Sequence, residues 1–217
     1  MIIVEVSEYN KETFRNFRVS FSSRISLKKA RELFENEEVG RILDIGCADG
    51  GFLKTFSAHV EKYGIDIIEQ KSEGFTFKQC NLEDGIPFED EFFDKIFCGG
   101  VIEHLLDTDF FLDECYRVLK RNGSLVLTTD NLSSLVNLLR WLKKEQPRMV
   151  GYNIHNNSWG HVRAYSIIAI NRQLEDHNFK IEFLGSIYTG NYNPIIKKLL
   201  EKILPLRGGI IVVKARK

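Results

Sequence analysis

The chain has 217 residues, of which 43% are hydrophobic and 28% charged, and its formal net charge is zero. This length allows one domain with a substantial core, and the composition is that of a globular protein rather than a disordered or fibrous one. No apolar run approaches the roughly 20 residues that a membrane-spanning helix needs.

The four cysteines indicate a reducing compartment. Cys47, Cys80, Cys98 and Cys115 are widely spaced and form no C-x-x-C pair. They are therefore expected to be free thiols rather than a disulfide framework or metal ligands, and no metal site is expected. Residues 1–6 are apolar but lack the basic leader and the length of a signal peptide. We expect a cytoplasmic protein.

Predicted strands and helices alternate along the chain. Strands are expected at 41–45, 60–65, 75–80, 92–98, 124–129, 180–186 and 209–215. Helices are expected at 26–37 (with Ser26 as N-cap), 51–58, 108–119, 132–143, 166–177 and 194–204, with a short linker helix before residue 75 and a turn at 121–123.

This alternation predicts a doubly wound, Rossmann-like α/β fold. The sheet would have seven strands, mostly parallel, with an antiparallel last strand because Gly208-Gly209 leaves little room for a crossover helix. We expect a single domain over 1–217, with an N-terminal helical segment at 1–40 and a substrate-loop insertion at 145–165.

The first predicted strand runs directly into a glycine turn. The sequence Asp44-Ile45-Gly46-Cys47-Ala48-Asp49-Gly50-Gly51 follows a short apolar run. Glycine tolerates positive φ and lets a ligand approach the backbone, and open α/β sheets bind ligands at the carboxyl ends of their strands. Dinucleotides and S-adenosylmethionine (SAM) both use this geometry, and a glycine turn alone does not distinguish them.

The ordered series of motifs does distinguish them. After the glycine turn come Asp66, Asn81-Leu82, Phe93-Asp94-Lys95-Ile96, Glu103-His104-Leu105, Tyr116 to Lys120 and Gly123-Ser124-Leu125. In this order and spacing the chain resembles the class I SAM-dependent methyltransferases, in particular the "methyltransferase type 11" group that includes quinone-biosynthesis and other small-molecule enzymes. The resemblance covers about residues 27–217 and is most specific over 41–130. A dinucleotide enzyme is disfavoured, because no separate substrate domain and no hydride-transfer constellation is found.

The resemblance implies SAM as cofactor, S-adenosylhomocysteine as product, and a set of binding residues. Asp44 and the turn would hold the methionine end, Asp66 both ribose hydroxyls and Asn81 the adenine amino group, while Gly99 and Val101 would border the methyl-transfer channel. The full expected set is Asp44, Gly46, Cys47, Ala48, Gly50, Asp66, Ile67, Asn81, Leu82, Gly99 and Val101. Two positions depart from the family pattern: Ala48 replaces a glycine and Asn81 a common aspartate, and either change is expected at most to weaken binding.

Two histidines are candidates for a general base, which an acceptor hydroxyl would require. His104 follows the fourth predicted strand, and His161 follows the insertion and should return to the same side of the sheet. The alternative for each is a structural role such as capping. Arg163 is expected either to bind an anionic acceptor group or to pair with a surface acid.

The partner implied most directly is a small-molecule acceptor of O- or N-methylation. Residues 131–217 carry 14 Lys and Arg against 5 Asp and Glu, which leaves wobble-uridine tRNA methylation open, although no appended RNA-binding domain or dense basic cluster supports it. A non-catalytic SAM-binding subunit also stays open. The predicted helix 194–204 is amphipathic and either contacts a membrane peripherally or covers its own sheet; we expect the second.

Overall fold

The computed structural model describes residues 21–35, 37–69, 71–148, 150, 161–189 and 192–217. Their centre is a sheet in the order β3-β2-β1-β4-β5-β7-β6. Its strands are β1 Arg41–Ile45, β2 Glu61–Asp66, β3 Thr76–Gln79, β4 Phe93–Gly99, β5 Leu119–Asp130, β6 Lys180–Ile187 and β7 Ile210–Arg216. Strand β7 is antiparallel to β5 and β6, whereas the pairs among β1 to β5 are parallel. The predicted α/β fold with a seven-stranded sheet and an antiparallel last strand is confirmed.

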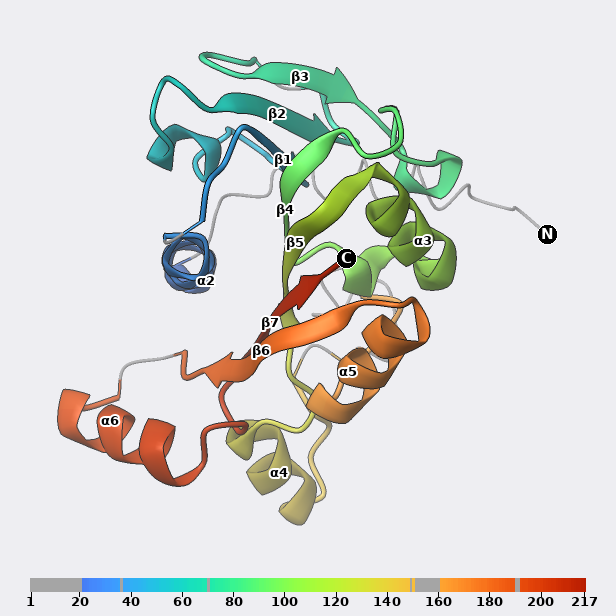
Figure 1. Ribbon diagram of the computed structural model, residues 1–217. Coiled ribbons are helices and arrows are strands. Elements are labelled where there is room, and N and C mark those ends of the chain that lie inside the picture. The colour runs from blue at the N-terminus through green and yellow to red at the C-terminus, as the bar shows by residue number, and fades with distance from the viewer. Residues whose placement is uncertain (1–20, 36, 70, 149, 151–160, 190–191) are drawn as a thin grey trace.

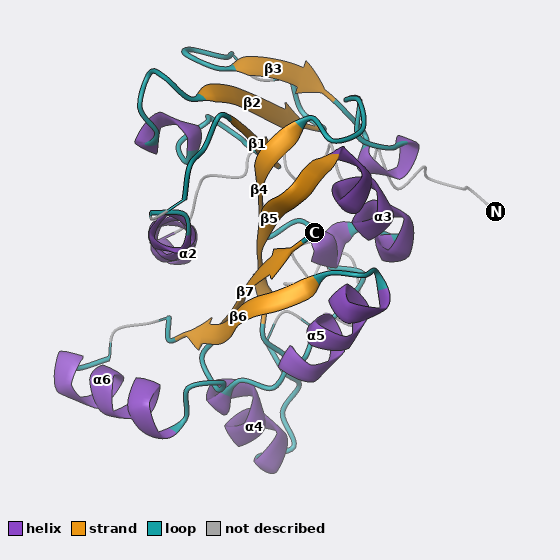
Figure 2. Ribbon diagram, viewed as in Figure 1, coloured by secondary structure: helices purple, strands orange, loops and turns teal. Residues whose placement is uncertain are grey.

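Helices flank the sheet on both faces (Figures 1 and 2). The α-helices are α2 Phe21–Leu33, α3 Thr108–Val118, α4 Leu135–Leu142, α5 Ile167–Asp176 and α6 Pro194–Ile203. Short 3-10 turns are η1 Leu53–Thr55, η2 Leu82–Asp84 and η3 Ile102–His104. Helix α2 lies on one face and α3 and α5 on the other, while α4 and α6 lie at one end of the molecule (Figure 1).

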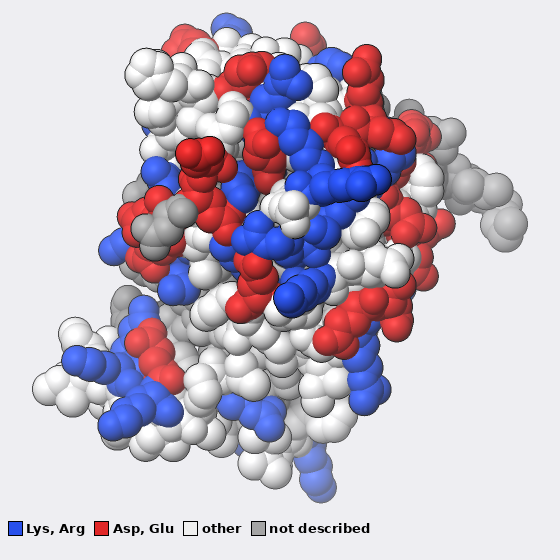
Figure 3. Space-filling model, viewed as in Figure 1, with Lys and Arg blue, Asp and Glu red and all other residues white. Residues whose placement is uncertain are grey.

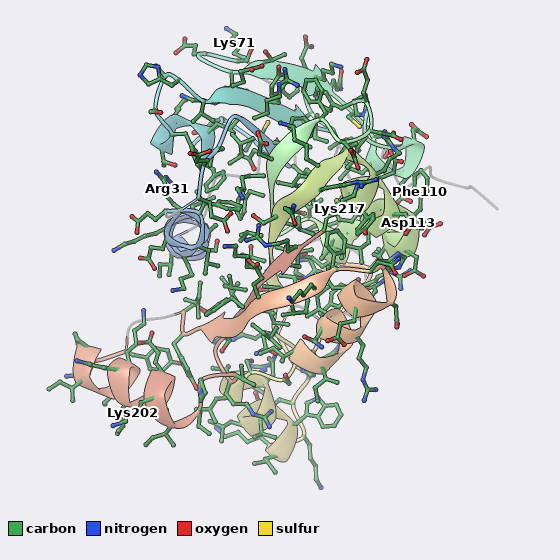
Figure 4. The ribbon with its side chains drawn as sticks, viewed as in Figure 1. Arg31, Lys71, Phe110, Asp113, Lys202 and Lys217 are labelled. Atoms are coloured by element: carbon green, nitrogen blue, oxygen red, sulfur yellow. The ribbon has the colours of Figure 1, made fainter. Side chains whose placement is uncertain are left out.

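The core has two halves because successive strand residues point to opposite faces. On β1, Ile42 packs with Ala30 and Phe34 on the α2 face, whereas Leu43 packs on the α3 and α5 face. The α3 and α5 face is also closed by polar contacts: His177 Nδ1, at the end of α5, lies 2.6 Å from Oδ1 of Asp113, which Figure 4 labels on α3. The sheet is thus fixed from both sides.

Four local predictions are wrong. The helix expected over 51–58 is only the 3-10 turn η1, and the linker helix before β3 is a series of bends in its described residues. Ser26 is not an N-cap, because α2 begins at Phe21 and Ser26 lies buried within it. The turn expected at 121–123 lies inside β5, where the pairing with β4 shifts register and Asn122 takes a φ of 63°.

Helix α6 does not cover the sheet, which corrects the expectation for 194–204. None of its residues is buried, and Ile195 is 79% and Ile203 62% exposed. Separately, no helix in the described part of the chain is both long and apolar enough to cross a membrane.

A cluster of charged side chains connects Glu37, in the linker after α2, to strands β4 and β7. Glu37 accepts hydrogen bonds from Lys95 on β4, from Lys214 (2.5 Å) and from Arg216 (2.8 Å), the last two on β7. Burial raises the pKa of Glu37, but the hydrogen bonds from Lys214 and Lys95 outweigh it and lower the pKa to about 2. The folded protein therefore stabilises the ionised form of the Glu37 carboxylate.

Candidate functional site

The glycine turn lies at the carboxyl end of β1, next to the end of β2. The backbone N–H groups of Gly46 and Cys47 both donate to the carbonyl of Ile65, at 2.9 and 3.1 Å. Gly46 has a φ of 72°, and a Cβ placed there would lie 2.5 Å from Val101 Cγ2. Gly50 has a φ of 70°, and its Cβ would lie 2.4 Å from Phe75 Cε1. Both positions therefore require glycine, for conformation and for space.

Three carboxyl groups surround this turn. Asp44 is buried at the middle of the sheet, and burial followed by the neighbouring charges of Asp66 and Asp49 raises its pKa well above the usual value. Burial also raises the pKa of Asp66. Because like charges repel in a poorly solvated site, a cationic ligand group at the turn would stabilise the ionised carboxylates. The charge of the site thus suits a positively charged ligand.

Asp66 also holds the turn in place. Its Oδ2 accepts from Ala48 N–H and its Oδ1 from Ile68 N–H, both at 3.0 Å. The residues that follow are bends rather than a helix, so Asp66 is not a helix cap. A carboxylate has about four acceptor positions, so the carboxylate retains acceptor capacity for ligand hydroxyls.

Two of the three residues between Gly46 and Gly50, namely Ala48 and Cys47, are less typical of a ligand turn. Ala48 adopts a φ of 45°, which strains a residue with a Cβ. Cys47 is buried, and burial and then the Asp44 charge raise the pKa of its thiol. The thiol is therefore held neutral.

Asn81 and Leu82 follow strand β3, which pairs with β2 next to Asp66. Cys80 N–H donates to the Asp66 carbonyl at 2.9 Å, and Asn81 then caps η2 by accepting from Glu83 N–H at 3.3 Å. Leu82 is half-buried against the core. The Ile67 carbonyl accepts from the Gln79 side chain at 2.9 Å. The structure thus keeps these expected residues at one edge, with the Asn81 amide already engaged in a local contact.

Strand β4 connects the glycine turn to the histidines. Gly99 pairs with Thr128 at the end of β4, and Val101 after it contacts Gly46. The turn η3 follows at once and carries Glu103 and His104. The two expected halves of the site therefore meet at Val101.

The structure brings His104 and His161 together. Their ring centroids are 4.7 Å apart in an edge-to-face arrangement. The backbone fixes this contact, because Val162 and Arg163 donate their N–H groups to the Glu103 carbonyl at 2.9 and 3.1 Å. His161 Nδ1 also lies 3.7 Å from Asp130 Oδ2. A carboxylate beside an imidazole orients the ring and supports a proton on it.

Two further acids lie in this group. Burial, and then the Asp130 charge, raises the pKa of Glu103 to about 8, and burial raises the pKa of Asp130 to about 6. Glu103, His104 and His161 each offer one metal-ligand atom, and these atoms lie within 4.8 Å of one another. Two imidazoles and one carboxylate are ligands that Zn²⁺ and related ions accept. The group therefore has to be tested for a metal as well as for acid–base chemistry.

A cavity of about 100 Å³ opens beside the histidines. It lies between the ends of β5 and β6 and the start of β7, which meet because β7 is antiparallel. Its lining includes Glu103, Asp130, Asn131, Arg148, Val150, His161, Tyr165, Tyr188, Tyr192 and Arg207. The cavity is thus both aromatic and charged, as small-molecule sites commonly are.

Arg163 lines the same cavity, so its expected role in binding an anionic acceptor group stays a prediction. Its guanidinium donates to the backbone carbonyls of Leu105 (3.2 Å) and Leu106. Asp130 was not among the predicted site residues. It ends β5 at the same edge of the sheet at which Asp66 ends β2, so its place at a strand end could have predicted it. No pattern in the sequence predicted that Asn131 and Tyr188 would line the cavity. Within the insertion, residues 149 and 151–160 lie outside the described part of the chain.

The sequence profile of the family described as "Methyltransferase domain" matches residues 17–183. The chain therefore belongs to this methyltransferase family. The resemblance to class I SAM-dependent methyltransferases is confirmed.

Curated relatives share part of their length with this chain. A bovine mitochondrial ubiquinone biosynthesis O-methyltransferase is 28% identical over 121 residues, covering 49% of this chain and 33% of the relative. A demethylmenaquinone methyltransferase of Oceanobacillus iheyensis is 25% identical over 160 residues, covering 66% and 61%. The chain thus spans about a third of the length of the first of these relatives.

A solved structure supports the same fold over more of the chain. A SAM-dependent methyltransferase from Mesorhizobium loti superposes with a TM-score of 0.62 at 18% identity, covering 88% of this chain and 98% of that protein. At this level of identity the similarity concerns the fold.

Proposed function

We propose that the protein transfers a methyl group from SAM to the oxygen or nitrogen of a small-molecule acceptor. The observation that carries this proposal is the shared edge of the sheet. The glycine turn and Asp66 lie at the ends of β1 and β2, and the histidine pair and the cavity lie at the ends of β4 and β5. Donor and acceptor would meet near Val101, between the two halves.

The residues at the turn fit SAM chemically. The glycine turn has no room for a side chain at Gly46 or Gly50. The carboxyl groups around the turn suit the positive charges of the ammonium and sulfonium groups of SAM. Asp66 would accept the ribose hydroxyls and Asp44 would stabilise the methionine end. Asn81 and Leu82 would contact the adenine, with Cys47, Ala48 and Ile67 contributing backbone, and Gly99 and Val101 would border the channel.

SAM supplies a methyl group on an already activated sulfonium. The chain therefore has mainly to align the acceptor and exclude water, and such alignment can contribute ~7–11 kcal/mol. His161 or His104 would take the proton from an acceptor hydroxyl, and Asp130 would orient His161. Asp130 is thus a positioning residue.

The cavity supports an acceptor with a polar aromatic or ring-shaped head. Three tyrosines line it together with Glu103, Asp130 and His161. One relative described above is named for ubiquinone biosynthesis and the other for demethylmenaquinone, and quinones combine a ring with oxygen groups. Arg148 and Val150 also line the cavity, which supports the 145–165 insertion as the substrate wall of a single domain. Free thiols at all four cysteines support a cytoplasmic location.

The first test is calorimetry with S-adenosylhomocysteine, followed by incubation of SAM labelled on the methyl group with extract of the source cells. Binding, and label in the small-molecule fraction, are expected. Label in RNA instead would favour tRNA methylation. Binding without transfer to any fraction would favour a non-catalytic subunit, and no binding would overturn the proposal.

A further inference from the structure

The outer surfaces of α4 and α6 expose large apolar side chains. Nine of the thirteen large apolar residues that are exposed among the described residues lie on these helices or directly after α6. They are Leu138, Leu139, Trp141, Leu142, Ile195, Ile196, Leu199, Ile203 and Leu206. We call this set the α4–α6 surface. Its concentration in two short helices distinguishes it from the scattered apolar residues of an ordinary surface.

Helix α6 is amphipathic toward the outside. Ile195, Leu199 and Ile203 are spaced by four residues and form one exposed stripe. In a helix of 3.6 residues per turn, Lys198 and Lys202 lie along one border of this stripe. An apolar stripe bordered by lysines is the arrangement of helices that lie in a lipid interface.

Helix α4 repeats this arrangement. Leu138 and Leu142 are spaced by four residues, and Leu142 is 73% and Trp141 68% exposed. Lys143 and Lys144 follow directly. Tryptophan is enriched at the boundary between hydrocarbon and headgroups, where its ring is half in contact with each.

The two helices belong to one part of the fold. Leu135 N–H at the start of α4 donates to the Arg207 carbonyl just after α6, at 2.8 Å. The Tyr188 hydroxyl donates to the Leu204 carbonyl at 2.8 Å. Both helices lie at the same end of the molecule (Figure 1), and the α6 lobe shows basic groups beside an acidic group, with uncharged surface around them (Figure 3).

The charge of this end is positive. Residues 135–145 and 194–203 carry the basic residues Arg140, Lys143, Lys144, Lys197, Lys198 and Lys202 against the acidic residues Glu145 and Glu201. Lysine is depleted in protein–protein interfaces, whereas it attracts anionic lipid headgroups. The combination of exposed leucine, isoleucine and tryptophan with lysine therefore favours a bilayer over a protein partner.

We propose that the α4–α6 surface docks on an anionic lipid bilayer. The acceptor cavity would then lie beside the bilayer, because Val136 and Asn137 of α4 line it together with Tyr192 before α6 and Arg207 after it. The docking itself does not depend on the proposed methyl transfer.

The test is co-sedimentation of the full chain with vesicles. Wild type should bind vesicles of phosphatidylcholine and phosphatidylglycerol in equal parts, bind pure phosphatidylcholine weakly, and be released by salt. Lys198→Glu with Lys202→Glu should lower the partition coefficient about tenfold or more. Ile195→Ser with Ile203→Ser should lower it on both vesicle types.

Matched controls keep the result specific. Ile168 on α5 is 64% exposed, so Ile168→Ser removes an equally exposed isoleucine elsewhere. Lys54→Glu with Lys71→Glu reverses two exposed lysines away from α6; Lys71 and Lys202 lie at opposite ends in Figure 4. These controls should bind like wild type, and all variants should keep their affinity for S-adenosylhomocysteine.

Two outcomes would overturn the proposal. One is wild type that stays in the supernatant with both vesicle types. The other is a dimer, by light scattering, that the Ile195→Ser and Ile203→Ser variant dissociates, since the surface would then join two copies of the chain. If wild type does not bind S-adenosylhomocysteine, that result would count against the proposed function and leave the docking result valid.

Discussion

The carboxylate of Asp66, at the end of β2, accepts a hydrogen bond of 3.0 Å from the backbone N–H of Ala48, in the turn after β1. This contact joins the two strand ends that the proposed SAM site uses. The Asp66 side chain therefore holds the conformation of the turn, and its carboxylate would also contact the ligand.

Substituting Asp66→Asn should weaken S-adenosylhomocysteine binding about tenfold to a hundredfold. The amide keeps one acceptor oxygen for Ala48 but loses the charge, and hydrogen bonds to charged groups contribute ~1.5–3 kcal/mol. Calorimetry measures the affinity, and Glu69→Gln, at an exposed acid just after β2, is the matched control. Unchanged affinity in Asp66→Asn would remove Asp66 from the site.

Reciprocal substitutions test the backbone of the turn. Gly46→Ala should lower the free energy of unfolding by about 2–5 kcal/mol, from positive φ and from the clash with Val101. Ala48→Gly should leave it within about 1 kcal/mol of wild type, because relief of the strain at φ 45° offsets the added entropy of the unfolded chain. Urea unfolding measures both. Equal losses in the two variants would contradict this account.

The histidine pair should act in catalysis rather than in cofactor binding. His161→Asn should slow methyl transfer to cell extract about a hundredfold, and Asp130→Asn should slow it less, because a positioned base contributes ~10²–10⁴-fold. Affinity for S-adenosylhomocysteine should not change, and His59→Asn, at an exposed histidine, should have no effect.

A chelator distinguishes the base from a metal at the same residues. Acid–base chemistry at His161 predicts that EDTA leaves the methylation rate unchanged. Loss of activity in EDTA, with recovery on adding a divalent cation, would contradict the base role and indicate an ion held by Glu103, His104 and His161.

Glu37 should make stability depend on acid pH. Its pKa is lowered from 4.5 to about 2 in the fold, so its contribution is complete above pH 4.5 and is lost as the pH falls toward 2. At neutral pH, Glu37→Gln should cost about 2–3 kcal/mol of unfolding free energy. Urea unfolding should show this difference disappearing in acid, with the exposed Glu38→Gln as control. A difference that stays constant with pH would contradict the assignment.

Local sequence predicted the elements well where pattern and burial agree. The bounds of β1 were predicted as observed, because an apolar run ends at a glycine with positive φ. Residues 51–58 were not, because packing of Phe52 and Leu53 against the sheet stabilises a single turn. The spacing in α6 predicted a helix but not which side would be covered, since spacing alone does not tell what an apolar stripe contacts.

The individual residues of the site could be predicted from the sequence, but not how the fold brings them together. Each glycine and carboxylate at a strand end could be named from the chain alone. The 4.7 Å approach of His104 to His161 depends on the Glu103 carbonyl and two N–H groups nearly 60 residues later. No local pattern specifies such a contact.

Asn131 holds three segments with one buried side chain. Its Nδ2 donates to the carbonyls of Leu206 (3.2 Å) and Gly208 (2.7 Å), and its Oδ1 accepts from Ser133 N–H at 3.0 Å. Its own carbonyl accepts from the Asn137 amide at 3.1 Å. The start of α4, the loop after α6 and the cavity wall are therefore joined by the hydrogen bonds of one residue. Replacing this asparagine would remove the side-chain contacts that connect the loop after α6 to the lining of the proposed acceptor cavity.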